Sequence, residues 1–267
     1  MLNACRLCGS KDLTLWMQDG HNRDLNYYRC GNCALWNYDL DCGMDQTQYT
    51  WRYVSPEDPR HKSNRVIAKS WAFLRSHVRG PGSMLDIGCG NGALLHLARK
   101  EGWRVRGMEL SKPMADAIEA DQGIEVTVCN FLDYEPEPGE RYDVVVLRHV
   151  LEHLPDSQLA MQKISGLLAE NGIAFLELPN TASFAYASKR LLKNRGLKNA
   201  RYAADWRPGH CNEFNREAFE YLARATGFEL IEWRTYSNKP FADWIYGVLP
   251  IASKVRVLAR KKAPTAR

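Results

Sequence analysis

The feature that most constrains this sequence is a cluster of glycines directly behind a short apolar run. In "MLDIGCGNG", Gly88, Gly90 and Gly92 follow residues 84–87 and precede a segment with apolar residues at helical spacing. Glycine is favoured where a ligand must approach the backbone more closely than a Cβ atom would allow. The pattern predicts a strand-to-helix turn at the carboxyl edge of a sheet, where ligands of open α/β sheets bind.

After Gly82 the chain alternates short apolar segments with amphipathic ones. We expect strands at residues 83–88, 104–110, 124–130, 142–148, 172–178, 228–236 and 254–260, and helices at residues 91–101, 112–121, 157–169 and 214–226. A further helix is expected within residues 61–78. This alternation is typical of an α/β fold in which a seven-stranded, mostly parallel sheet is covered by helices on both faces.

Four of the eight cysteines form two identical pairs near the N-terminus, Cys5-x2-Cys8 and Cys30-x2-Cys33. Each pair can direct two thiolates at one ion, and two pairs supply the four sulfurs of a tetrahedral zinc site. Residues 12–18 and 25–30 would be the strands of such a ribbon. Structural zinc mainly stabilises a module that is too small to have its own core. We therefore expect a zinc-ribbon-like module at residues 1–42.

The rest of the chain divides into a linker and one large domain. Residues 43–60 are expected to be the linker and residues 61–267 the domain, with residues 181–213 as an insert that covers the substrate. Residues 1–50 hold four Lys or Arg against six Asp, whereas residues 181–213 hold seven against two acids. Basic and aromatic side chains together suit a sugar or an anionic substrate. The alternative is an amphipathic lid helix with a solvated basic face.

An acidic residue, Glu109, ends the second expected strand, 21 residues after Gly88. A carboxylate at this point can accept hydrogen bonds from both hydroxyl groups of a ribose. NAD and S-adenosylmethionine both contain such a ribose, so Glu109 does not distinguish between them. A dinucleotide site would show G-x-G-x-x-G where this chain has G-x-G-x-G, but a glycine pattern alone is weak evidence, so the cofactor is distinguished by the full set of motifs.

Four segments together resemble the class I S-adenosylmethionine-dependent methyltransferases: "LDIGCGNG", "MELS", "NFLDYEP" and "YDVVVLRHVLEHLPD". The resemblance covers roughly residues 60–262 and is strongest with the branch that methylates small molecules. In overall architecture the chain looks like methyltransferases of bacterial surface-glycan or secondary-metabolite pathways. The resemblance implies a Rossmann-like sheet and S-adenosylmethionine as the cofactor.

The resemblance also assigns residues to the parts of the cofactor. The amino-acid end is expected at Asp86, Gly88 and Gly90, the ribose at Glu109, and the adenine at Leu110, Asn130 and Phe131. Asn130 stands where the family often has Asp, and its carbonyl can still accept a hydrogen bond from the adenine amine.

Three histidines are candidates for a catalytic base, which an oxygen or nitrogen acceptor requires if its proton must be removed. His149 and His153 follow the fourth strand of the domain, and His210 lies in the insert. Histidine titrates near neutral pH, so each of them suits this role. The alternative is that these residues and Glu152 only order the loop. The sequence predicts no catalytic metal.

The function expected from the sequence is methylation of an oxygen atom on a small-molecule or sugar-containing acceptor, with anionic acceptors included. One alternative is an RNA methyltransferase that grips nucleic acid with its ribbon, although a net-acidic ribbon disfavours phosphate binding. The other is a non-catalytic scaffold that binds the cofactor.

No apolar run approaches the roughly 20 residues of a membrane span, and the N-terminus does not resemble a secretory signal. We therefore expect a cytoplasmic protein with reduced thiols.

Overall fold

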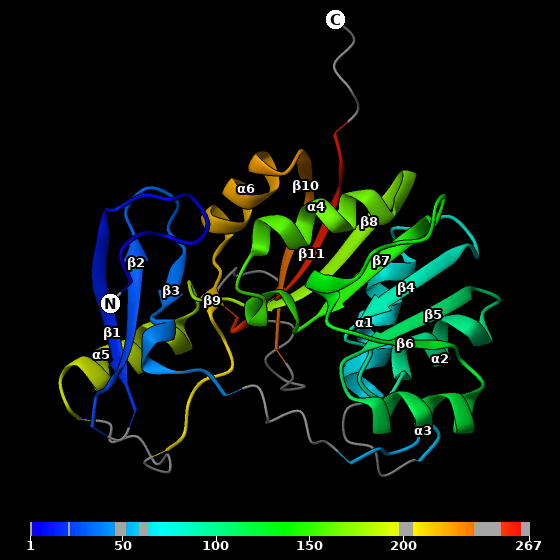
Figure 1. The fold of residues 1–267 in the computed structure, drawn as a ribbon, viewed down its shortest axis with the longest axis horizontal. Coiled ribbons are helices and arrows are strands. Elements are labelled where there is room, and N and C mark those ends of the chain that lie inside the picture. The colour runs from blue at the N-terminus through cyan, green and yellow to red at the C-terminus, as the bar shows by residue number, and fades with distance from the viewer. Residues whose placement is uncertain are drawn as a thin grey trace, which may run out of the picture.

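The computed structural model describes residues 2–20, 22–45, 52–58, 64–197, 205–237 and 252–262. The described residues form two β-sheets that lie side by side (Figure 1). The smaller sheet has four strands, three of which come from the N-terminal module, whereas the larger sheet has seven.

The seven-stranded sheet confirms the expected α/β fold. Its strands are β4 (Ser83–Ile87), β5 (Arg104–Glu109), β6 (Val126–Val128), β7 (Tyr142–Arg148), β8 (Leu168–Pro179), β10 (Phe228–Tyr236) and β11 (Lys254–Lys261). Their order is β10-β11-β8-β7-β4-β5-β6, and β11 runs antiparallel to both of its neighbours while the other pairs are parallel. The order of the strands reverses beside β4, so the glycine turn lies at the switch point of the sheet.

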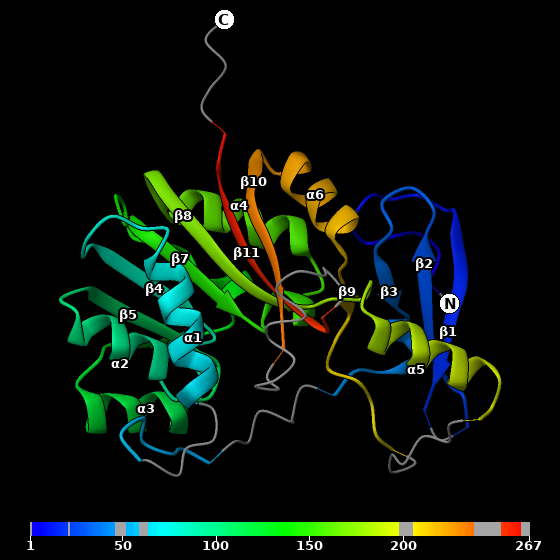
Figure 2. The ribbon, with the colours of Figure 1, turned by 180° about the vertical axis from the view of Figure 1, so that it is seen from behind.

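Helices cover both faces of this sheet (Figures 1 and 2). One face carries α1 (Asn64–Arg75), α2 (Ala93–Lys100) and α3 (Lys112–Gln122), and the other carries α4 (Ser157–Leu167) and α6 (Arg216–Ala225). Each face has its own apolar layer, one around Trp71 and Leu94, the other around Ile164 and Phe219. Among the residues that the structure describes, no helix has both the length and the apolar character needed to cross a bilayer.

The smaller sheet joins the N-terminal module to a distant part of the chain. Its strands are β1 (Leu13–Asp19), β2 (Leu25–Cys30), β3 (Trp36–Tyr38) and β9 (Asn212–Glu213). Strands β1 and β2 are antiparallel and correspond to the two strands expected for the ribbon. Strand β9 comes from the end of the predicted insert and pairs with β3. The insert therefore completes the sheet of the N-terminal module.

The insert also contributes helix α5 (Phe184–Asn194), which lies against β1 (Figures 1 and 2). Lys193 forms a buried ion pair with Asp19, and Lys189 Nζ lies 3.5 Å from the same carboxylate. The guanidinium of Arg190 stacks 3.8 Å from the ring centroid of Trp16. These basic side chains of the insert thus face the acidic module. Residues 198–204 of the predicted insert lie outside the described residues.

The predicted linker is attached to the large domain over its described part. Tyr53 and Ser55 donate hydrogen bonds to the Asp121 carboxylate at 2.6 and 2.7 Å. Asn91, in the glycine turn, donates to the carbonyl of Val54 at 3.0 Å. This part of the chain therefore lies against α3 and the glycine turn. Residues 46–51 and 59–60 of the predicted linker lie outside the described residues.

A fully buried carboxylate, Glu177 of β8, connects four elements of the large domain. It accepts hydrogen bonds from Ser70 of α1 at 2.6 Å, Arg148 of β7 at 2.7 Å and Arg256 of β11 at 3.0 Å. Burial alone would raise the pKa of Glu177, but the two guanidinium groups and the hydroxyl outweigh this effect and lower it to about 2. Glu177 is therefore ionised throughout the physiological range.

The Glu177→Gln variant is expected to lower the free energy of unfolding by about 3–5 kcal/mol, because it leaves two buried guanidinium groups without their counter-ion. Urea denaturation measures this loss. The matched control is Glu229→Gln, which removes an exposed carboxylate paired with Arg260 and should cost at most about 1 kcal/mol. Equal losses of unfolding free energy in the two variants would contradict the role assigned to the buried Glu177 carboxylate.

The low pKa of Glu177 also sets the sign of a pH dependence. A carboxylate with a depressed pKa stabilises the fold above its unfolded pKa of about 4.3, and this contribution is lost as the pH falls toward the folded value. The stability difference between the wild type and Glu177→Gln should therefore shrink between about pH 4 and pH 2. A difference that stays constant over this range would count against the depressed pKa.

Candidate active site

The glycine turn after β4 is tight on one side and open on the other. Gly88 has φ +68°, and a Cβ atom there would lie 2.5 Å from Cγ2 of Val150. Gly90 has φ +57°, and a Cβ atom there would have no neighbour within 4 Å among the described residues. The turn therefore packs against the segment that follows β7 and leaves its backbone accessible at Gly90.

Glu109, at the end of β5, lies beside this accessible backbone. One carboxylate oxygen accepts a hydrogen bond from the Gly90 amide at 3.0 Å. The other accepts from the amides of Leu110 and Ser111 at 2.9 and 3.1 Å. The carboxylate is thus fixed at the edge of the turn, where the sequence predicts contact with a ribose.

Asp86 lies within β4 and is buried below the turn. Its Oδ1 atom has no hydrogen-bond partner among the described residues. Burial raises the pKa of Asp86 to about 7, although the nearby Arg148 guanidinium opposes this shift. Buried acceptors are almost always paired in native proteins. The orphaned oxygen beside an open turn therefore fits a ligand that carries a hydrogen-bond donor or a positive charge, as the amino-acid end of S-adenosylmethionine does.

The residues expected around the adenine occupy the ends of β5 and β6. Leu110 is 54% exposed, which is high for a large apolar side chain. Asn130 is exposed, and its Oδ1 atom accepts from the Leu132 amide at 3.1 Å. Phe131 is buried in the core beneath them. Leu110 and Asn130 are therefore accessible to a ligand, and the roles of all three remain predictions.

The segment after β7 brings the predicted histidines together around Glu152. His149 has φ +55°, a conformation uncommon for a residue other than glycine, and its Nδ1 atom lies 3.2 Å from Glu152 Oε1. The rings of His153 and His210 pack edge to face with centroids 4.6 Å apart. Glu152 is fully buried. Burial raises its pKa, but the hydrogen bond and the charge of His149 outweigh burial and lower it.

Hydrogen bonds give the three histidines different properties. Nδ1 of His153 lies 2.8 Å from the Gly209 carbonyl, which can only accept, so Nδ1 carries the proton and Nε2 bears the lone pair of the neutral ring. Burial lowers the pKa of His153. Burial also acts to lower the pKa of His210, but Glu213 Oε1, 3.0 Å from its Nδ1, outweighs burial and raises it to about 9. These opposite shifts favour the neutral form of His153 and the protonated form of His210 near neutral pH.

Three of these side chains also have the arrangement of a metal site. The ligand atoms of Glu152, His153 and His210 all lie within 4.8 Å of one another. Carboxylate and imidazole groups are common ligands of divalent cations. The sequence did not predict this set, because His210 is far from the other two residues along the chain.

Two further charged residues of the site were not predicted. Glu213 of β9 holds His210, and Nζ of Lys254, at the start of β11, lies 3.5 Å from Nε2 of His149. Glu213 and Lys254 each lie at the end of a strand, where charged residues are common, and neither belongs to a recognisable motif. The sequence signal for them is therefore weak.

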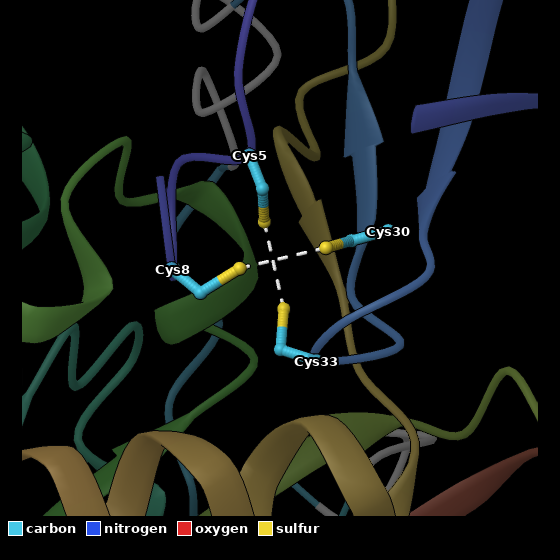
Figure 3. Close-up of side chains that lie close together, drawn as sticks. All are labelled: Cys5, Cys8, Cys30 and Cys33. Atoms are coloured by element: carbon cyan, nitrogen blue, oxygen red, sulfur yellow. Dashed lines mark hydrogen bonds between the residues drawn. The ribbon is translucent and has the colours of Figure 1, made fainter. Parts of the chain in front are cut away.

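The four paired cysteines converge in the N-terminal module (Figure 3). The sulfurs of Cys5 and Cys33 are 3.5 Å apart, as are those of Cys8 and Cys30. Tetrahedral coordination with Zn–S bonds of about 2.3 Å places sulfurs about 3.8 Å apart. Contact with the Cys33 thiol lowers the pKa of Cys5 to about 5. The donor set and its spacing therefore fit zinc.

Comparison with known proteins identifies the class of the large domain. A family model described as a methyltransferase domain matches residues 59–232, and the chain belongs to this family. It is a class I S-adenosylmethionine-dependent methyltransferase, as the sequence predicted.

Curated relatives include two ubiquinone biosynthesis O-methyltransferases. The protein from Coxiella burnetii is 26% identical over 147 residues, covering 53% of this chain and 62% of the relative. The protein from Xanthomonas campestris pv. campestris is 27% identical over 143 residues, covering 51% of this chain and 59% of the relative. The matches thus span less than two thirds of the length of these relatives.

Solved structures share the fold at lower identity. A protein from Pyrococcus horikoshii OT3 has a TM-score of 0.58 and 14% identity, covering 82% of this chain and 100% of that one. Magnesium protoporphyrin IX methyltransferase from Synechocystis PCC 6803, solved with bound SAH, has a TM-score of 0.53 and 16% identity, covering 77% and 86%.

The Gly88→Ala variant tests whether the tight side of the turn shapes the cofactor site. The added Cβ would displace Val150, so affinity for S-adenosylhomocysteine should fall at least about tenfold, as a loss of about 1.4 kcal/mol implies. Isothermal titration calorimetry measures the affinity.

Gly139→Ala is the matched control, because Gly139 also has positive φ and a Cβ there meets nothing within 4 Å among the described residues. Both variants should lose stability from the backbone conformation, but only Gly88→Ala should lose affinity. An unchanged affinity in Gly88→Ala would refute the placement of the cofactor at this turn.

Proposed function

We propose that this methyltransferase transfers the methyl group of S-adenosylmethionine to an oxygen atom of a small-molecule acceptor. The observation that carries the proposal is the contact of Val150 with Gly88, which joins the histidine cluster directly to the glycine turn. A group that can accept a proton therefore lies beside the expected methyl donor. The O-methyltransferase names of the curated relatives support the same choice of acceptor atom.

In this proposal the carboxyl ends of β4 and β5 hold the cofactor. Asp86 faces its amino-acid end, the amides of the turn contact it at Gly88 and Gly90, and Glu109 receives the ribose hydroxyls. The adenine lies near Leu110, Asn130 and Phe131. When bound, S-adenosylmethionine supplies a methyl group on a positively charged sulfur. The main task of the protein is then to align the acceptor oxygen with that methyl group.

We assign the removal of the acceptor proton to His153. Its Nδ1 atom is held by the Gly209 carbonyl, which directs the lone pair to Nε2. His149 is less suited, because Nζ of Lys254 lies 3.5 Å from its Nε2 atom. His210 is less suited as well, because Glu213 holds it in the protonated form.

The same cluster offers a second way to activate the acceptor. If His210 gave up its proton, Glu152, His153 and His210 would hold a divalent cation, which would supply Lewis acidity that favours an ionised acceptor hydroxyl. With or without a cation, the cluster favours an acceptor that becomes an anion.

We further propose that the acceptor contains a sugar or carries a negative charge. Its support comes from Lys254 and protonated His210, which place positive charge beside the cluster. The basic side chains of α5 give it less support than the sequence suggested, because Lys189 and Lys193 pair with Asp19.

We also propose that zinc occupies the four-cysteine site and stabilises the N-terminal module. A cytoplasmic location accords with this, because thiolates stay available for metal where thiols are kept reduced. The described cysteines are all free thiols in the structure, with no disulfide among them.

Incubation with S-adenosylmethionine labelled on its methyl group, together with a cell extract, tests the reaction. The products are separated into small molecules, glycans, RNA and protein. Label is expected in the small-molecule or glycan fraction, in a form that resists acid and base as an ether does. Label in RNA would instead favour an RNA methyltransferase, and cofactor binding without any transfer would favour a non-catalytic scaffold.

Two variants separate the roles within this reaction. Glu109→Ala should abolish cofactor binding and transfer together. His153→Gln should keep cofactor affinity but lower the rate of transfer by about 10²–10⁴-fold, the usual contribution of a general base. His96→Gln, on α2, is the matched control and should transfer normally. Full activity in His153→Gln would remove His153 from the mechanism.

The Cys30→Ser variant tests the zinc site. It should hold less than one zinc ion per chain and unfold at a lower urea concentration, because structural zinc contributes folding free energy directly. Cys129→Ser, which alters a cysteine outside the tetrad, should retain both zinc and stability. Metal analysis by mass spectrometry and urea denaturation provide the readouts. Equal zinc content in Cys30→Ser and the wild type would rule out this coordination.

A further inference from the structure

We propose that Arg6, which lies inside the first cysteine pair, is a positioning residue for the histidine cluster, so that the zinc module is part of the catalytic apparatus. The inference rests on the proposed function of that cluster. It goes beyond the structural role proposed for zinc, because it assigns the module an effect on the reacting groups.

The zinc site and the large domain share one core. Cys5, Leu7 and Cys33 belong to the same apolar cluster as Leu151, which precedes Glu152, and Phe214, which follows β9. Leu7 is 1% exposed, and its carbonyl accepts a hydrogen bond from Gln158 of α4. The module is therefore packed into the domain, and a displacement at the zinc site acts on the elements that carry the cluster.

Arg6 joins the zinc site to β9. Its guanidinium donates to the Cys211 carbonyl, and its Nε atom donates to Asn212 Oδ1 at 3.3 Å. Its backbone amide donates to Asn37 Oδ1 at 3.0 Å, while Asn37 Nδ2 lies 3.4 Å from the sulfur of Cys5. One continuous set of hydrogen bonds thus connects a zinc-binding sulfur with residues 211 and 212.

Packing alone does not explain why an arginine, rather than an apolar residue, occupies position 6. The Arg6 side chain is partly buried, so taking its charge out of water costs free energy. Its partners are carbonyl oxygens rather than a carboxylate, and its third guanidinium nitrogen makes no hydrogen bond with the described residues. An apolar side chain of similar length would fill the space at lower cost. The feature that Arg6 adds is the fixed position of the 211–212 peptide.

Residues 211 and 212 in turn hold the segment that carries Glu152 and His153. The Cys211 amide donates to the Glu152 carbonyl at 2.9 Å, and Asn212 Nδ2 donates to the Leu154 carbonyl at 2.7 Å. Residues 211 and 212 therefore lie between Arg6 on one side and the segment that carries Glu152 and His153 on the other.

The same strand also sets the position of His210. Glu213 lies opposite Trp36 in the β3–β9 pair, and its carboxylate bonds both His210 Nδ1 and the hydroxyl of Tyr186, each at 3.0 Å. Movement of β9 relative to β3 would thus move Glu213 and His210 together. The segment with Glu152 and His153 and the strand that positions His210 thus both depend on the contact of Arg6 with residues 211 and 212.

The inference predicts a loss of turnover without a loss of cofactor binding. The residues assigned to the cofactor lie in or just after β4, β5 and β6, and the side-chain hydrogen bonds of Arg6 given above go to residues 211 and 212 instead. A displacement of about 1 Å in a catalytic group can cost about 100-fold in rate. Removal of the Arg6 contacts should therefore lower kcat by about 10- to 100-fold.

The experiment uses the full chain loaded with zinc, in the wild type, Arg6→Met and Lys11→Met. Met keeps the length of the arginine stem without its donors, and Lys11 is an exposed residue of the same module. Zinc content, S-adenosylhomocysteine affinity by calorimetry and the imidazole NMR signals of the histidines are measured. His153→Gln and His210→Gln assign two of the seven histidine signals.

Arg6→Met is expected to keep its zinc and its affinity for S-adenosylhomocysteine while the signals of His153 and His210 shift or broaden. Lys11→Met should match the wild type in every respect. Signals of His153 and His210 that coincide with those of the wild type would overturn the inference. If Arg6→Met fails to fold or to hold zinc, Arg6→Gln, which is too short to reach Cys211, is judged by the same signals.

The two proposals fail in different ways. Shifted histidine signals in an enzyme that methylates nothing would support the positioning role of Arg6 and refute the proposed reaction. Unchanged signals in an active enzyme would refute the positioning role and leave the reaction in place.

Discussion

The buried charge of Glu177 links the parts of the molecule that must stay in register for methyl transfer. Its side chain joins α1, β7, β8 and β11, and its backbone carbonyl accepts from the His149 amide at 2.8 Å. One of its partners, Arg148, also moderates the pKa of Asp86 under the glycine turn. Breaking such a buried pair is costly because the remaining charges stay desolvated. The network therefore fixes the sheet edge on which the cofactor and the histidine cluster both depend.

Sequence patterns predicted the structural features that are specified by residues close together in the chain. The seven strands follow from apolar periodicity, the turn from closely spaced glycines, and the four-cysteine site from two identical pairs, so each is specified within a few residues. The pairing of β9 with β3, the docking of α5 and the partners of Glu177 were missed, because each joins segments far apart in the chain. His149, His153 and His210 were predicted one by one, but only the fold shows that Glu152 gathers them.

The uneven charge of the sequence illustrates how such a pattern can be explained in two ways. The basic and aromatic side chains of the insert suggested an anionic substrate, whereas the structure pairs Lys189 and Lys193 with Asp19 and stacks Arg190 on Trp16. Opposite charges on separate segments specify docking within the chain as readily as binding of a ligand. The evidence on the acceptor therefore comes from the groups that surround the cluster itself, among them Lys254 and Glu213.

The position of β11 has a consequence for how the chain is made. This strand follows β10 in sequence but lies between β10 and β8, so the sheet stays divided until residues 254–261 have left the ribosome. Until then Glu177 lacks Arg256, and β8 presents an unpaired edge with an incompletely neutralised charge. An edge of this kind resists pairing with other chains. The residue that secures the finished sheet would thus also disfavour edge-to-edge pairing of the incomplete one.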